Sequence, residues 1–341
     1  MSGTVLSESE HRSAPRRGGR KLKLLLAALA VLAAAGTGTW YVAFRLPAER
    51  ARAAFETAAR GVEQQQSGDL EAAIRSFQAA TRLDADNSRA WLLLGQAHRE
   101  RASDSAEGLK ALERASALAP TEAPVVREYG FALRQTGRFE KARDVLRRVV
   151  ALDPTDAAAR VELAQAHLGL DGSPENLEAA ISELRTGLDL EPGNARARYF
   201  LARTLFQREQ LPEAEREFKL TLSLLAAGAR QSPGIMDGFL NNSARWLSFV
   251  KSAHHYLGQI AYRSRRDAEA ARYRAVHEDI KRYLEVTREP FRMLTVDAND
   301  PAARAALSKI YVRFGFPRSG PDGAAAARRW IPSVAEPKGD E

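Results

Sequence analysis

The chain contains no cysteine, and this absence excludes several kinds of chemistry. Without thiols there is no thiol nucleophile, no cysteine metal site, no disulfide and no lipidated N-terminal cysteine. The 341 residues also lack a glycine-rich phosphate loop, a nucleophile elbow and a recognisable pair of catalytic acids. We therefore expect a protein that is not an enzyme and holds no cofactor. The lack of thiols suits a chain exported into an oxidising compartment.

Positive charge is in excess overall, but most of the excess lies at the N-terminus. The net charge of +8 comes from 51 basic and 43 acidic residues. Residues 1–46 hold seven of the basic and two of the acidic residues, which leaves 44 basic and 41 acidic residues in the remainder. Such a balanced body argues against a nucleic-acid-binding protein, so no nucleic acid is expected as a partner.

One long apolar run stands near the N-terminus. Leu24–Phe44 contains no charged residue, and a helix of this length is long enough to cross a bilayer. Six basic residues precede the run closely, and fewer follow it, so the positive-inside rule places the N-terminus in the cytoplasm. We expect a disordered basic tail over residues 1–20 and an uncleaved single-pass signal-anchor over 21–45. The rest of the chain would then be periplasmic, at the inner membrane.

A cleaved signal peptide is the competing interpretation of the same run. Ala33–Ala35 ends a stretch of the usual signal-peptide length, so cleavage after Ala35 would fit the sequence. The apolar run continues through Phe44, which favours an anchor.

The stretch Ala123–Asp156 sets the pattern for most of the remaining chain. Its apolar residues recur every three or four positions, which predicts amphipathic helix. Gly137 interrupts the period near the middle, and Asp153-Pro154 ends it. The stretch therefore holds two short helices joined by a turn.

This stretch resembles a tetratricopeptide repeat, in its length as well as in its pattern. In the family's register, Gly130 and Ala142 occupy the small positions where the two helices cross, and Leu146 and Val149 occupy core positions. Similar units occupy residues 54–87, 88–122, 157–194 and 195–228. The resemblance implies an all-α fold, a right-handed α-solenoid with five repeats over 54–228 that follows the N-terminal transmembrane helix.

The C-terminal third carries a weaker form of the pattern. We expect degenerate repeat-like helices and a C-terminal cap over 239–331, with a long helix ending near Glu289-Pro290. Ala324–Ile331 would form a short closing helix whose Trp330 covers the open end of the stack. Residues 332–341 are expected to be disordered.

The family's habits also indicate a candidate binding groove. First helices of successive repeats line a concave surface, and the positions that face it carry arginine with interleaved aromatics here. The predicted groove residues are Arg89, Gln96, Arg99, Arg127, Phe131, Arg134, Gln165, Arg196, Tyr199, Arg203 and Phe206. Arginine pairs with carboxylates and stacks on rings, so the partners would be proteins or peptides with acidic and apolar side chains. A solvated arginine face without a partner is the simpler alternative.

The sequence predicts no metal site. His98 and His167 occupy the same repeat position, which usually packs in the core, and the adjacent pair His254-His255 would point in different directions on a helix. The favoured function is a membrane-tethered scaffold or adaptor in the cell envelope. The alternative is a dedicated, non-catalytic accessory subunit of one envelope enzyme or export complex, such as polysaccharide export or cytochrome maturation.

Overall fold

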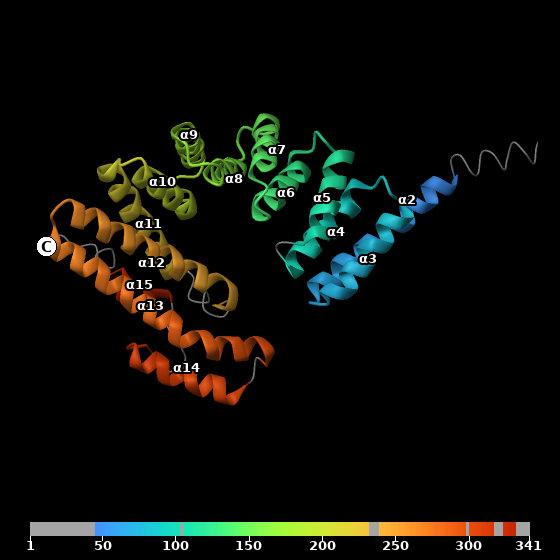
Figure 1. Ribbon diagram of the computed structural model, residues 1–341. Helices are drawn as coiled ribbons and strands as arrows, with labels where there is room; N and C mark the ends of the chain where they lie inside the picture. The colour runs from blue at the N-terminus through green and yellow to red at the C-terminus, as the bar shows by residue number, and fades with distance from the viewer. Residues whose placement is uncertain (1–44, 103–104, 232–238, 298–299, 317–322, 332–341) are drawn as a thin grey trace, which may run out of the picture. The chain divides into compact units, whose positions relative to one another are not determined.

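The computed structural model describes residues 45–102, 105–231, 239–297, 300–316 and 323–331, and every regular element in these ranges is an α-helix. Within each unit, most successive helices pair into hairpins, and neighbouring hairpins stack side by side (Figure 1). The sequence pattern predicted this all-α stack of paired helices. The chain divides after Arg101 into two compact units, which are described separately.

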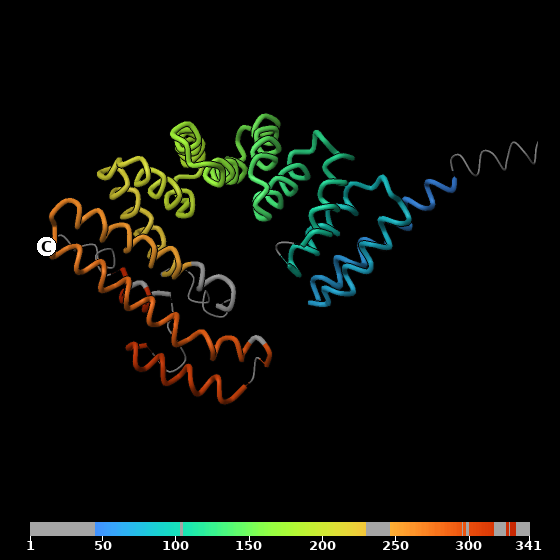
Figure 2. The backbone as a smooth tube through the Cα atoms, viewed as in Figure 1, coloured from blue at the N-terminus to red at the C-terminus, as the bar shows by residue number. Residues whose placement is uncertain are grey.

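Figure 2 shows the backbone path through the helices of each unit. The first unit contains α2 (Leu46–Gln66), α3 (Leu70–Leu83) and α4 (Ser88–Arg101). The second unit begins with α5 (Ala106–Leu118), α6 (Ala123–Gln135), α7 (Phe139–Leu152), α8 (Ala157–Leu168), α9 (Pro174–Leu190), α10 (Ala195–Gln207) and α11 (Leu211–Gln231). It ends with α12 (Phe239–Arg263), α13 (Asp267–Val296), α14 (Pro301–Arg313) and α15 (Gly323–Trp330). The unit boundary falls within the predicted second repeat, whose two helices are α4 and α5.

The predicted anchor, Leu24–Phe44, and the two predicted tails, 1–20 and 332–341, lie outside the described residues. Among the helices of the described ranges, none combines the length and the apolar character that a membrane span requires.

Small residues let the two helices of a repeat cross closely. A Cβ atom at Gly130 of α6 would lie 2.8 Å from the Leu146 side chain of α7, and Leu146 is itself fully buried. Gly137, in the turn between these helices, has a φ of +73°, a conformation that side chains other than glycine rarely adopt. The repeat register therefore located both the crossing and the turn correctly.

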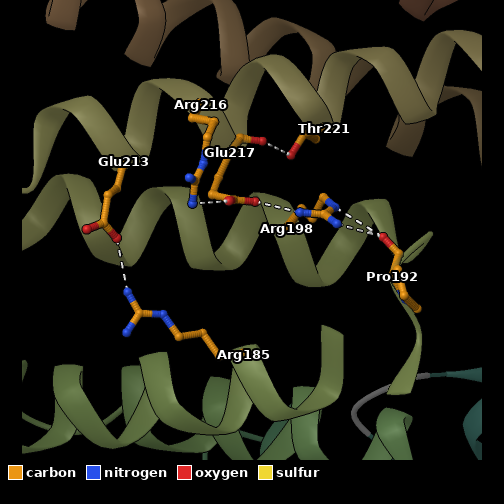
Figure 3. A network of polar contacts seen from close by, with 7 residues as sticks. All are labelled: Arg185, Pro192, Arg198, Glu213, Arg216, Glu217 and Thr221. Atoms are coloured by element: carbon orange, nitrogen blue, oxygen red, sulfur yellow. Dashed lines mark hydrogen bonds and ion pairs between the residues drawn. The ribbon is translucent and has the colours of Figure 1, made fainter. Parts of the chain in front are cut away.

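A recurring clamp ties each of three first helices to the chain just before it. Arg198 donates two hydrogen bonds to the carbonyl of Pro192, 3.1 and 3.0 Å long, and pairs at 2.8 Å with buried Glu217 of α11 (Figure 3). Arg160 binds the Pro154 carbonyl and Glu183 of α9 in the same way. In the first unit, the Trp91 indole donates to the Ala85 carbonyl at 2.9 Å, again six residues back. The clamp fixes the entry of α4, α8 and α10 into their repeats.

The helix α13 is longer than the sequence predicted. It continues through Pro290 to Val296, although the predicted end was Glu289-Pro290. Proline in a helix interior removes one backbone hydrogen bond and usually ends or bends the helix. Here Pro290 is buried, and Phe291 and Leu294 pack against the hydrophobic core beyond it. This apolar burial holds the last turns of the helix.

The C-terminal helix does not cover the open end of the stack, which corrects the predicted role of Trp330. Instead, α15 packs against α11, and the Trp330 ring is buried against Tyr283 of α13. The Trp330 indole N–H donates to Asp279 of α13 at 2.9 Å. The backbone carbonyl oxygen of Trp330 lies 2.7 Å from Nε2 of His254 in α12. Arg329 adds a two-bond ion pair with Asp279. We call Arg329, Trp330 and their partners His254, Asp279 and Tyr283 the C-terminal clasp.

The clasp makes stability depend on pH through His254. Burial, with a smaller effect of His277, lowers the pKa of His254 from 6.5 to about 4. Its Nδ1 atom is buried without a hydrogen-bond partner, so a proton added there would be unsolvated. Because the folded-state pKa is the lower one, the stabilisation is complete above pH 6.5 and is lost as the pH falls toward 4. The loss amounts to about 3 kcal/mol.

We therefore expect thermal denaturation of the wild type to shift to lower temperature between pH 6.5 and 4. His254→Gln keeps a donor for the Trp330 carbonyl and cannot titrate, so its melting temperature should fall less over the same range. Equal pH dependence of the two proteins would contradict this role of His254.

Candidate protein-binding face

The first helices of the second unit present the face on which the sequence placed its groove. We call this surface the first-helix face and define it by side chains of α6, α8 with its N-cap residue, and α10. Its charged members are Arg127, Arg134, Asp156, Glu162, Arg196 and Arg203. Its other members are Phe131, Gln165 and Phe200.

The arginine nearest the start of α6 is paired with a carboxylate. Arg127 donates to Asp156 at 2.8 Å, and Asp156 also caps α8 by accepting from the Ala159 backbone N–H at 2.9 Å. The Arg127 guanidinium lies 5.9 Å from the Phe131 ring centroid. Arg127 therefore holds the N-terminus of α8, the first helix of the next repeat, through Asp156.

A buried carboxylate joins the three first helices. Glu162 of α8 is 3% exposed and is paired with Arg134 of α6 on one side and with Arg196 of α10 on the other, the latter at 2.8 Å. Arg196 also donates to the Gln165 amide oxygen at 3.2 Å. A buried carboxylate is tolerated when it is paired and hydrogen-bonded. This Arg134–Glu162–Arg196 triad therefore fixes the relative positions of the three helices.

Arg203 differs from its neighbours. Among the described residues, no carboxylate pairs with it, whereas Arg127, Arg134 and Arg196 each have one. Its buried Nε atom has no hydrogen-bond partner, which is also true of Arg127. Its guanidinium lies 5.2 Å from the Phe200 ring centroid, and that of Arg196 lies 5.7 Å from the same centroid. Two cations therefore flank one half-buried aromatic ring on α10.

Tyr199 does not line an open surface, which corrects its place among the predicted groove residues. It is 8% exposed and packs edge-on against Phe249 of α12 at 4.8 Å between ring centroids. Burial raises the pKa of Tyr199, an effect that Ser252 and Arg203 oppose. The repeat register assumed that every such position faces outward, but here the aromatic side chain is covered by α12.

Phe206 lies farther along α10, in a second aromatic group. Its ring contacts Tyr256 of α12 at 5.1 Å, and the Arg263 guanidinium lies 4.9 Å from its centroid. Arg263 in turn pairs with Glu209 at 2.8 Å. The two charged residues at this contact between α10 and α12, Arg263 and Glu209, therefore pair with each other.

The other predicted groove residues belong to the first unit, on α4. Arg89 is exposed, and Gln96 and Arg99 are half-buried. They are not part of the first-helix face, which is defined within the second unit alone.

Sequence reasoning missed Glu162, Asp156 and Phe200. The repeat register assigns them to positions that were not assumed to face the groove, and pairing between different repeats leaves no local signal. A hydrophobic run interrupted by one acid, as in Ala157–Leu168, was the only available indication of a buried Glu162.

The histidines do not form a metal centre in the described part of the chain, where no group of three or more metal-ligating side chains comes together. His98 and His167 are each 4% exposed, as their repeat position predicted. Nδ1 of His167 lies 3.1 Å from the Asn176 side-chain oxygen, which satisfies this buried ring nitrogen.

Stacked helix hairpins with a shared register define a helical repeat protein. Family models described as tetratricopeptide repeat match residues 58–123, 123–166 and 173–227. Residues 58–166 and 173–227 of the chain therefore match tetratricopeptide repeats. Repeats of this family generally mediate protein–protein interactions and usually serve as non-catalytic scaffolds.

Similar folds occur among solved structures. MamA from Desulfovibrio magneticus RS-1 is 22% identical over 50% of this chain and 94% of its own, with a TM-score of 0.46. YrrB, described as a tetratricopeptide-repeat protein with an unusual peptide-binding site, is 19% identical over 49% of this chain and 84% of its own, with a TM-score of 0.44. No curated protein matches the sequence. Likeness at this level assigns neither a partner nor a site to this chain.

Proposed function

We propose that this protein is a membrane-tethered adaptor that binds other proteins through its first-helix face. The observation that carries the proposal is the charge of this face. Four arginines (Arg127, Arg134, Arg196 and Arg203) stand against two carboxylates, and aromatic rings lie between them. Cationic and aromatic side chains that remain partly exposed suit a partner with acidic and apolar residues.

The tether forms the second part of the proposal, and the sequence supports it. The uncharged run Leu24–Phe44, with basic residues before it, favours a single-pass anchor with a cytoplasmic N-terminus. The repeats would then work on the outer side of the inner membrane. Tethering raises the local concentration of the face near membrane-bound partners. Recovery of a mature chain that lacks residues 1–35 would contradict the anchor.

The binding role is testable by placing a photo-crosslinking amino acid at single positions of the membrane-bound chain. Benzoylphenylalanine at Phe131 replaces an aromatic side chain of α6 on the first-helix face. The same amino acid at Leu152 is the matched control, because Leu152 is 42% exposed and lies on α7, the second helix of the same repeat. We expect crosslinks from position 131 to a specific protein, and none to that protein from position 152.

Equal crosslinking from both positions, or none from 131, would contradict binding on this face. One protein captured in fixed stoichiometry would indicate a dedicated subunit, whereas several partners would indicate an adaptor.

A further inference from the structure

We infer that Arg196, Phe200 and Arg203 form an anchor for an acidic segment of the partner. In that segment, one apolar side chain lies between two carboxylates. This inference rests on the proposed function and names the chemistry that the partner must present. We call these three residues of α10 the acid anchor.

The acid anchor has an aromatic floor between two cations. The guanidinium carbons of Arg196 and Arg203 lie 5.7 and 5.2 Å from the centroid of the Phe200 ring. The Phe249 ring of α12 stands edge-on to Phe200, 6.4 Å away between centroids. Both rings are half-buried, so part of each remains open to a ligand. Cations beside aromatic faces favour a ligand that offers both negative charge and an apolar group.

One of the two charges of the anchor, that of Arg203, has fewer carboxylate partners than the other arginines of the face. Arg127 and Arg134 each have a carboxylate from α8 or its N-cap. Arg196 shares Glu162 with Arg134 and keeps a 45% exposed side chain. Arg203 has no carboxylate among the described residues. The Nε of Arg203 is buried, and its side chain also hydrogen-bonds Tyr199. An arginine carries five N–H donors, so the terminal nitrogens of both anchor arginines still supply donors for an incoming carboxylate.

The spacing of the two arginines limits the partner. Arg196 and Arg203 are separated by two turns of α10, a rise of about 10 Å along the helix axis. In an extended segment, side chains at positions i, i+2 and i+4 point to the same side, and the outer two lie about 13 Å apart at their Cα atoms. Acidic side chains at i and i+4 can therefore converge on the two guanidinium groups, and the residue at i+2 then lies over Phe200. The pattern acid–x–apolar–x–acid fits the anchor.

The test uses a fluorescent peptide with Glu-Ser-Leu-Ser-Glu at its core and the full-length protein in detergent. Fluorescence anisotropy should show saturable binding that weakens as salt is raised. A peptide with Gln in place of both Glu residues, and one with Ser in place of Leu, should each bind at least about fivefold more weakly. Arg203→Gln should weaken binding of the acidic peptide by about five- to tenfold.

Matched variants separate the anchor from general charge and from misfolding. Arg272→Gln removes an exposed arginine from α13 and should leave affinity unchanged. Arg203→Lys keeps the charge and loses the planar donor set, so its affinity should fall between those of wild type and Arg203→Gln. Equal binding of the acidic and the neutral peptide, or equal effects of Arg203→Gln and Arg272→Gln, would overturn the inference. If crosslinking at position 131 still captures a partner in that case, the adaptor stands and only the acid anchor fails.

Discussion

Replacing Arg134 by methionine is expected to lower the free energy of unfolding by about 2–4 kcal/mol. The substitution leaves Glu162 buried at 3% exposure with Arg196 as its remaining cationic partner. A buried carboxylate that loses a partner keeps most of the cost of its desolvation. Urea denaturation followed by circular dichroism measures the change, and Arg272→Met supplies an exposed control that should shift stability by less than about 0.5 kcal/mol.

The double variant Arg134→Met with Glu162→Leu identifies the cause. It removes the buried charge together with its partner, so most of the lost stability should return, to within about 1 kcal/mol of wild type. If the double variant is as unstable as the sum of the two single variants, the triad does not hold the three first helices together. The same result would remove the structural reason for the positions of Arg134 and Arg196 on the face.

Truncating Trp330 to alanine is expected to cost about 3–5 kcal/mol. The ring is 1% exposed, contacts Tyr283 and Phe316, and donates a hydrogen bond to Asp279. Its loss opens a cavity and leaves Asp279 with Arg329 as its remaining partner in the clasp. Hydrogen exchange should rise first in α15 and in the adjacent part of α13.

Tyr262→Ala is the control for this substitution, because Tyr262 is an aromatic side chain that is 67% exposed on α12. Its melting temperature should stay close to that of wild type. If Trp330→Ala melts like Tyr262→Ala, the C-terminal helix contributes no stability, and the account of the clasp is wrong.

The repeat register predicted the core of the fold well because each repeat solves the same local packing problem. A small residue is required wherever two helices cross as closely as at Gly130, and a large apolar residue such as Leu146 must fill the space opposite. These requirements recur once in every repeat, so they are visible without any structure.

Contacts that break the register could not be predicted in the same way. Pro290 normally ends a helix, but burial of the side chains after it outweighs this local preference. Trp330 was expected at an open end, because nothing in its own sequence neighbourhood shows that Asp279, far earlier in the chain, receives its indole N–H.

The candidate site was predicted in part, and the reason lies in pairing between repeats. Position in the repeat placed Arg127, Arg134 and Arg203 on first helices, but only the structure shows which of them has a carboxylate partner. The pairs join residues of different repeats, and such pairing depends on how the hairpins stack. Phe200 was missed because its role follows from the two arginines that flank it.

The most direct test of binding through the first-helix face is charge reversal with a matched control. Arg203→Glu reverses the charge of one arginine on the first-helix face. Arg272→Glu reverses the charge of one exposed second-helix arginine of the same unit, with the same change in net charge. Partners are captured by crosslinking from intact membranes, after both variants are shown to melt like wild type. Binding through the first-helix face predicts loss of capture in the first variant and full capture in the second. Equal capture by both variants would contradict it.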